Sequence, residues 1–221
     1  MDTTGYRPPS QQELSVLHIS ERLIVLDKPS GLLTVPGRGS TKADCLLSRV
    51  HVKYPDAMIV HRLDMATSGI VVMGRGPKYQ RALSILFQER KVRKRYEALV
   101  DGQWKTTTEG EINLPMRADW PNRPRQKIDR LSGRPSQTLY RIISSDTSND
   151  VSRIELMPVT GRTHQLRVHM ESIGHPILGD ELYGTERSRS KADRLMLHAC
   201  YIEFAHPDTD ATITVASSAP F

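Results

Sequence analysis

The sequence predicts an α+β fold, with a mixed, largely antiparallel sheet of two fused subdomains and flanking helices. Short apolar runs of strand length are more numerous along the chain than stretches with helical periodicity. Strands and helices follow one another without the regular alternation that builds a parallel sheet. The length of 221 residues suits one large domain or two fused smaller ones, and it is sufficient to bury a core.

The N-terminal segment is polar and contains prolines, and we expect residues 1–20 to form a loosely held tail before one domain over residues 21–221. The tail lacks the apolar stretch of a signal peptide and is too short to span a membrane. The two cysteines, Cys45 and Cys200, lie far apart without CxxC spacing, which argues against a zinc cluster or a disulfide scaffold. These features predict a cytoplasmic protein in a reducing compartment.

The first elements of the domain are a strand and a helix. Residues 23–27 are apolar and predict a strand, and the Lys-Pro-Ser-Gly segment at 28–31 supplies the turn after it. Thr41 and Asp44 have the spacing of a capping box, so a helix should begin after them and end before Pro55. Its apolar side would consist of Leu46, Leu47, Val50 and Tyr54.

The middle of the chain predicts a second helix and most of the strands. Pro77 suits the first turn of a helix that runs to about Arg90, and five of the six residues from Arg90 to Arg95 are cationic. Alternating apolar and polar residues predict a strand that begins at Tyr96. Prolines and cations from Ala118 to Arg134 predict an ordered loop or a short ribbon. Further strands are predicted at residues 110–114, 137–143, 151–157, 195–204 and 212–216.

The last predicted helix begins with Thr163 as its N-cap and ends at Gly174. Its inward side would carry Leu166, Met170 and Ile173. Arg167 lies one position from this apolar stripe. It should therefore project from the helix edge, where a partner outside the helix could reach it.

The stretch from His61 to Gly69 concentrates functional groups between two apolar runs, 58–60 and 70–73, that read as buried strands. Asp64 is its only carboxylate, and Arg62 lies two residues away. Loops held by rigid strands often carry the chemistry of an enzyme. A structural Arg–Asp pair that pins a turn explains these nine residues equally well, because such pairs also fill loops.

Three segments together resemble the signature motifs of the RluA-type pseudouridine synthases. They are His61-Arg62-Leu63-Asp64 with Thr67-Ser68-Gly69, then Lys94-Arg95-Tyr96, and then Gly161-Arg162-Thr163-His164-Gln165-Leu166-Arg167-Val168-His169. The segments 178–180 (Leu-Gly-Asp) and 183–184 (Tyr-Gly) also match the pattern of that family. The similarity extends from about residue 23 to the C-terminus and implies the pseudouridine synthase catalytic fold.

The resemblance implies a role for each matching position. Asp64 would be the catalytic aspartate, Arg167 its salt-bridge partner, and Tyr96 a catalytic residue that packs on the target uracil and takes part in removing the proton from C5. Arg62 would enter the gap left when the target nucleotide is flipped out of the RNA. The reaction implied needs no cofactor and no metal. The presence of one carboxylate in these motifs agrees with an isomerase, because hydrolytic glycosidases generally pair two.

Basic loops predict RNA as the partner. The chain has 31 Lys and Arg against 25 Asp and Glu, a net charge of +6, and the excess is locally concentrated. Arg123, Arg125 and Lys127 follow the exposed-looking Trp120, and we expect them to contact RNA through phosphates and stacking. A merely solvated surface loop is the alternative.

The segment Asp119 to Pro124 is most similar to the family member that modifies both rRNA and tRNA. The implied substrates are a hairpin-loop uridine of 23S rRNA and an anticodon-loop uridine of tRNA. An enzyme restricted to one of these RNAs is the first alternative, and an RNA-binding or RNA-folding factor with incidental catalysis is the second. No S4 RNA-binding domain is expected before residue 23, and we expect a monomer without any membrane association.

The histidines are predicted to be structural. His164 and His169 are five residues apart, about 140° around a helix, unlike the i, i+4 pair of a zinc protease. We expect His164 to order its motif through hydrogen bonds, and His169 to lie partly in the core. His61 is likewise expected to be structural.

Overall fold

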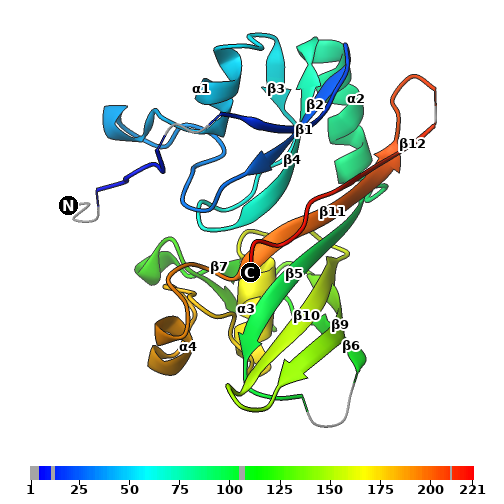
Figure 1. The fold of residues 1–221 in the computed structure, drawn as a ribbon. Helices are drawn as coiled ribbons and strands as arrows, with labels where there is room; N and C mark the ends of the chain where they lie inside the picture. The colour runs from blue at the N-terminus through cyan, green and yellow to red at the C-terminus, as the bar shows by residue number, and fades with distance from the viewer. Residues whose placement is uncertain (1–4, 11–12, 105–107, 210) are drawn as a thin grey trace. The chain divides into compact units, whose positions relative to one another are not determined.

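The computed structural model describes residues 5–10, 13–104, 108–209 and 211–221, and it divides into two compact units (Figure 1). The first unit comprises residues 1–93 and 199–219, and the second comprises residues 94–198 and 220–221. Most strand pairs in both units are antiparallel. The predicted α+β fold with a largely antiparallel sheet is confirmed. Within the described residues, no helix is both long and apolar enough to cross a membrane.

The first unit is built on a sheet whose central strands are continuous apolar runs. Its order is β1 (Ser15–Ile19), β2 (Leu23–Lys28), β4 (Ser68–Arg75) and β11 (Leu197–Ala205), of which residues from 199 on belong to this unit. β3 (Ala57–Ile59) pairs with the end of β4, and β12 (Thr212–Ala216) pairs with β11. Helices α1 (Leu46–His51) and α2 (Gly76–Gln88) and a 3₁₀ turn at Ser40–Lys42 complete the unit.

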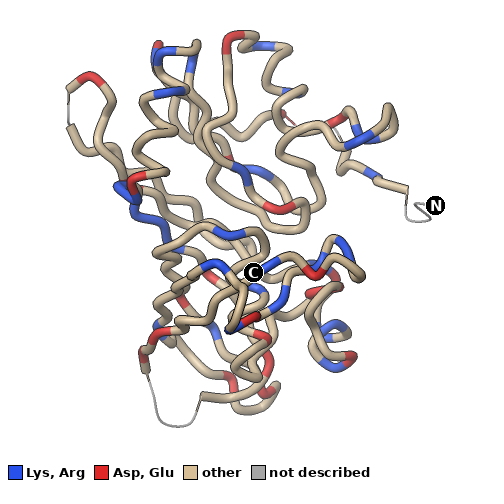
Figure 2. The backbone as a smooth tube through the Cα atoms, turned by 180° about the vertical axis from the view of Figure 1, so that it is seen from behind, with Lys and Arg blue, Asp and Glu red and all other residues tan. Residues whose placement is uncertain are grey.

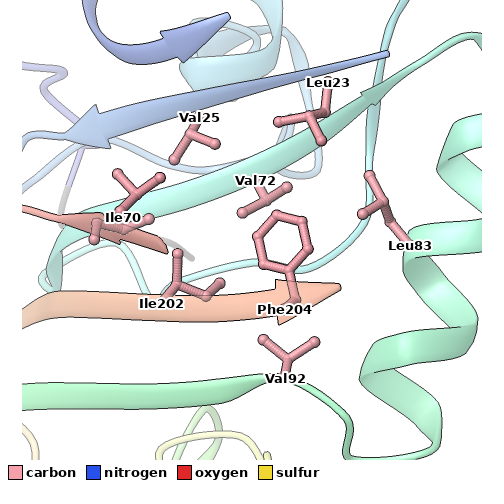
Figure 3. Close-up of a cluster of buried hydrophobic side chains, with 9 residues drawn as sticks. Leu23, Val25, Ile70, Val72, Leu83, Val92, Ile202 and Phe204 are labelled. Atoms are coloured by element: carbon pink, nitrogen blue, oxygen red, sulfur yellow. The ribbon is translucent and has the colours of Figure 1, made fainter. Parts of the chain in front are cut away.

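The core of the first unit lies between this sheet and helix α2 (Figure 3). Residues at alternate positions of β2 and β4 point to one face of the sheet and pack with Leu83 of α2 and Phe204 of β11. Burying each such side chain contributes about 1.5–3 kcal/mol to folding. The strands therefore hold their ends, and the loop between β3 and β4, on a rigid base. The other sheet members of the cluster are Leu23, Val25, Ile70, Val72, Ile202 and Val215.

Three expectations for the first unit are wrong. Residues 15–19 are not part of a loose tail, because they form β1, antiparallel to β2; residues 1–4 and 11–12 lie outside the described residues. The cap of α1 is Cys45, whose sulfur accepts from the N–H of Ser48, whereas Asp44 instead forms an ion pair with Arg49. β3 is only partly buried, since Met58 is 37% exposed.

The second unit contains a four-stranded antiparallel sheet. Its order is β5 (Arg93–Asp101), β10 (Val151–Pro158), β9 (Gln137–Asp146) and β6 (Glu109–Asn113). A separate two-stranded ribbon pairs β7 (Met116–Ala118) with β8 (Gln126–Ile128), and a 3₁₀ turn, Trp120–Asn122, lies between them. This confirms the short ribbon expected there. Helices α3 (Gln165–Ser172) and α4 (Glu186–Ser190) complete the unit.

The boundaries of several elements in the second unit differ from the prediction, and β9 runs to Asp146 rather than to residue 143. The strand expected to begin at Tyr96 begins at Arg93, because the cationic run continues as extended backbone. Thr163 is not the cap of α3. The cap residue is His164 in a left-handed conformation, φ 55°, without a side-chain capping hydrogen bond. The helix α4 was not predicted, since five polar residues carry no apolar periodicity.

Candidate active site

Asp64 lies in the connection between β3 and β4 of the first unit. β4 already begins at Ser68, so the connecting loop covers residues 60–67 and is shorter than the predicted nine-residue stretch. The side chain of Asp64 is partly buried, and that of Arg62 is exposed. The N–H of Thr67 donates to the carbonyl of Asp64 at 3.1 Å, which closes a turn at the carboxylate.

The segment after β2 holds this loop by its main chain. The hydroxyl of Thr34 accepts from the N–H of Leu63 at 3.2 Å and donates to the carbonyl of Leu63 at 2.7 Å. The hydroxyl of Ser30 donates to the carbonyl of Ala66 at 2.7 Å. These contacts fix the backbone before and after Asp64 without using its carboxylate.

Lys28, at the end of β2, is completely buried and supports the same loop. Its ammonium donates to the carbonyls of Pro29 and Leu32, both at 2.8 Å, and to that of Met65 at 3.1 Å. The N–H of Gly31 also donates to the Met65 carbonyl, at 2.8 Å. A buried ammonium is costly unless its donors are satisfied, and main-chain carbonyls provide that here. Lys28 is therefore a structural lysine with one acceptor in the loop of Asp64.

Two neighbours of Asp64 have structural explanations. Gly69 has φ +111°, and a Cβ at this position would lie 2.4 Å from the carbonyl oxygen of Ala199. His61 accepts the N–H of Val72 at its Nε2 (3.0 Å) and stacks on Phe87 with ring centroids 4.5 Å apart. The structural interpretation of His61 is confirmed.

Arg167 of α3 is buried, only 4% exposed, and forms an ion pair with Asp180. Nε and Nη2 of Arg167 donate to the two carboxylate oxygens of Asp180 at 2.8 and 2.6 Å. Asp180 Oδ1 also accepts the main-chain N–H groups of Leu182 and Tyr183. This partner differs from Asp64, which the resemblance implied, and the burial of Arg167 was not predicted. This two-pronged pair fixes the plane of the guanidinium.

Tyr183 joins this pair to the ribbon. Its hydroxyl accepts the main-chain N–H of Gln126 at 2.7 Å and lies 2.7 Å from Nδ1 of His164. The guanidinium carbons of Arg167 and Arg125 lie 5.1 and 5.2 Å from the centre of its ring, within the range of cation–π attraction. Burial raises the pKa of Tyr183 to about 12, so the hydroxyl stays protonated near neutral pH.

Tyr96 lies on β5 of the second unit, opposite Leu156 of β10. It shares one face of the strand with Ala98 and Val100, which are fully buried, while Tyr96 itself is partly exposed. The strand therefore holds the backbone of Tyr96 in the core and leaves part of its ring accessible. This placement suits a residue that packs on a ligand.

The ribbon carries three predicted RNA-contacting residues, all exposed: Arg123 and Arg125 lie in the connection between β7 and β8, and Lys127 lies on β8. Trp120 is 61% exposed, and the guanidinium carbon of Arg123 lies 3.2 Å above its ring centroid. Lys127 lies 3.6 Å from a carboxylate oxygen of Asp119. Arg125 stacks on Tyr183, as described above. The ribbon thus presents a flat aromatic surface among cations.

The histidines of α3 and its cap are structural. His169 is fully buried, and its ring nitrogens contact Thr138 (2.9 Å), Ser136 (3.2 Å) and the Leu114 carbonyl (3.1 Å). Burial lowers the pKa of His169, which favours the neutral ring. His164 holds Tyr183 from its left-handed cap position. Both expected structural roles are confirmed.

The predicted residues fall into two groups. Arg62 and Asp64 share one loop of the first unit, whereas Tyr96, Arg167 and the ribbon cations belong to the second. The predicted contact between Asp64 and Arg167 joins the two units and stays a prediction. Sequence reasoning did not assign roles to Asp180 and Tyr183, although the matching segments 178–180 and 183–184 could have pointed to them.

Comparison with known proteins gives one consistent result. Residues 22–172 match the family model described as RNA pseudouridylate synthase. The protein of Escherichia coli strain K12 named dual-specificity RNA pseudouridine synthase RluA is 42% identical over 221 residues, which is the whole of both chains. The protein of the same name from Pasteurella multocida is 41% identical, again over both whole chains.

Solved structures agree with the sequence comparison. The structure of human RNA pseudouridylate synthase domain containing 1 superposes with a TM-score of 0.81 at 29% identity, covering 97% of this chain and 87% of that one. That of human RNA pseudouridylate synthase domain containing 4 gives a TM-score of 0.73 at 22% identity and shows the same fold, covering 93% and 88%.

Proposed function

Because the chain belongs to the RNA pseudouridylate synthase family and isomerises uridine in RNA, we propose that it acts on both a 23S rRNA hairpin loop and a tRNA anticodon loop. One observation carries the proposal. Relatives named as dual-specificity enzymes are 41–43% identical to this chain, several over its whole length. Unpaired loops suit this recognition, because their bases can be splayed out and flipped.

Asp64 is the proposed catalytic aspartate, and Arg167 is its proposed salt-bridge partner, which orients it. The bond from N1 of the uracil to C1′ breaks and a bond from C5 to C1′ forms, so N1 gains a proton and C5 loses one. The detached base stays in the site, so no water has to be activated. The anchored loop of residues 60–67 supports this role, because a carboxylate that acts on one atom must be held in place.

Tyr96 is proposed to pack on the target uracil, and its partly exposed ring on a buried strand supports this. Arg62 is proposed to fill the gap left by the flipped nucleotide. It is exposed and lies two residues from Asp64, and a planar guanidinium can stack between the bases that remain.

The ribbon is proposed to grip the RNA outside the site of chemistry. Lys and Arg positions occur throughout both units with Asp and Glu positions among them (Figure 2), so net charge alone does not identify the RNA-contacting surface. Arg123, Arg125 and Lys127 differ from scattered surface cations because they lie on one short ribbon with the exposed Trp120, on whose ring Arg123 packs. Base stacking and phosphate contacts together are typical of proteins that bind single-stranded RNA. We place the enzyme in the cytoplasm as a monomer.

The deciding experiment measures release of tritium from C5 of uridine. Purified protein is incubated with two labelled transcripts, a tRNA and a 23S rRNA hairpin, beside Asp64→Ala as the inactive control. Release from both transcripts, with none from the variant, supports the proposal. Release from one transcript narrows the substrate to that RNA.

A cellular test separates the enzyme from an RNA-folding factor. If Asp64→Ala restores the function of a deletion strain in full, the cellular role does not depend on isomerisation. Arg167→Ala, assayed under conditions in which circular dichroism shows it folded, should abolish turnover and retain RNA binding. Equal loss of binding would count against Arg167 as the partner of the aspartate.

A further inference from the structure

Most of the cations from Arg90 to Arg95 form ion pairs with carboxylates. Three of the five form ion pairs within the described residues. These pairs are Lys91 with Glu89 at 2.7 Å, Arg93 with Glu203 at 3.1 Å, and Arg95 with Glu155 at 3.3 Å. Such contacts are ordinary for a strand at the surface. Lys94 differs from all three.

Within the part of the chain that the structure describes, the ammonium of Lys94 meets no protein acceptor. Among the described residues, its Nζ makes no hydrogen bond and no ion pair, although the side chain is partly buried. Burial lowers the pKa of Lys94, with no carboxylate to oppose the effect. No side-chain nitrogen of the described part of the chain is both sealed from solvent and unsatisfied, so a ligand can still reach Nζ.

Lys28 shows what a structural lysine looks like in this fold. It is more deeply buried than Lys94, and its three donors meet three main-chain carbonyls. Lys94 bears part of the desolvation cost without that compensation. A desolvation cost that no contact within the folded protein offsets is typical of side chains whose partner is a ligand.

The surroundings of Lys94 fit an anion. A Cβ built on Gly161 would lie 3.9 Å from Nζ of Lys94 and would meet nothing else within 4 Å, so the space beside the ammonium is open. Gly161 is followed by the exposed cation Arg162. Lys94 also lies on the same face of β5 as Tyr96, two residues and about 7 Å along the strand, which is the scale of one nucleotide.

We propose that Lys94 binds a phosphate of the RNA backbone beside the target uridine. This rests on the proposed function, because Tyr96 is the residue assigned to the target base. A compact ammonium is well suited to a phosphate oxygen, which returns the solvation that burial removed. The contact would hold the flipped nucleotide from its backbone while Tyr96 holds its base.

The test compares Lys94→Met with Lys53→Met, which removes the same charge from an exposed position in the first unit. RNA binding is measured from low to high salt, and the salt slope should fall by about 0.7–0.9 for Lys94→Met and stay unchanged for the control. Lys94→Arg should restore the slope. Lys94→Met should fold at least as stably as the wild type, because an uncompensated charge is lost.

A scan with single methylphosphonate linkages then identifies the phosphate. Each linkage near the target uridine is neutralised in turn. The wild type should lose affinity at one linkage at which Lys94→Met loses none further. Additive losses at every linkage, or an unchanged salt slope, would overturn the proposal. Loss of tritium release with unchanged binding and slope would overturn it too, since Lys94 would then act on the chemistry.

The two proposals fail in different ways. If the wild type binds these RNAs without releasing tritium from either, the substrate assignment fails. The methylphosphonate scan still tests the contact between Lys94 and one phosphate in that case, because it measures RNA affinity and does not require turnover.

Discussion

The loop of Asp64 and the cluster around Arg167 are anchored in opposite ways. Main-chain groups on both sides of Asp64 are bonded to the segment 28–34. Arg167 is fixed by side chains, through Asp180 and the ring of Tyr183. The loop therefore depends on residues far from it in sequence, and the arginine depends on a short stretch that follows its helix.

These two kinds of anchor predict how the loop of Asp64 and the cluster around Arg167 respond to substitution. A main-chain anchor distributes its cost over several hydrogen bonds, each worth about 1 kcal/mol. A buried ion pair concentrates its cost, because removal of one partner leaves the other charge in a poor environment. Four variants, from the largest expected effect to the smallest, test this contrast.

Asp180→Ala should be the most damaging. Loss of the carboxylate from a pair that is 5% and 1% exposed should lower the free energy of unfolding by about 3–5 kcal/mol. Urea unfolding measures it. The matched control is Asp56→Ala, whose pair with Arg75 is exposed and at a similar distance of 2.9 Å; it should cost at most about 1 kcal/mol. Equal losses from both variants would remove the contrast.

Thr34→Val keeps the shape of the side chain and removes its hydroxyl. The N–H and the carbonyl of Leu63 both lose their partner, which should cost about 2 kcal/mol. The rate of isomerisation should fall by more than the loss of stability explains, because the backbone next to Asp64 is no longer held in place. Thr41→Val, at an exposed position, should change the free energy of unfolding by less than about 0.5 kcal/mol. A loss confined to stability would contradict the role in positioning the loop.

Tyr183→Phe should cost about 1 kcal/mol at neutral pH, because the ring stays and only the hydroxyl contacts to Gln126 and His164 are lost. The pKa of Tyr183 is about 12 in the folded protein, above its ordinary value of 10. The stability tied to the protonated hydroxyl is therefore complete below pH 10 and is lost as the pH rises toward 12. Between pH 10 and 12, the free energy of unfolding of the wild type should fall toward that of Tyr183→Phe. A constant difference would refute the shifted ionisation.

Replacing Arg123 and Arg125 together by Ala should leave stability within about 0.5 kcal/mol of the wild type, because both side chains are exposed. RNA binding should weaken, and its salt slope should fall by about 1.4–1.8 for two lost phosphate contacts. Lys53→Ala is the control for removal of charge alone. An unchanged slope in the double variant would show that the ribbon does not contact phosphates.

The strands were predictable because each carries its own pattern. β2, β10 and β12 were expected close to their observed bounds, since apolar or alternating runs are visible in a single segment. The caps were less predictable. Cys45 is a rare cap, and His164 caps through a left-handed backbone that its sequence does not signal. β1 was missed because a mostly exposed edge strand has a weak apolar pattern.

For the candidate site, the sequence alone identified Asp64, Tyr96 and Arg167 as members of three motifs and placed them on a loop, a strand and a helix. Those placements follow from local patterns and from resemblance. Only the tertiary structure showed that Lys28 and Thr34 hold the loop, that Asp180 and Tyr183 hold Arg167, and that Lys94 has no protein acceptor among the described residues. Hydrogen bonds between residues tens of positions apart, and the burial of a charge, depend on how distant segments pack, and no local pattern encodes them.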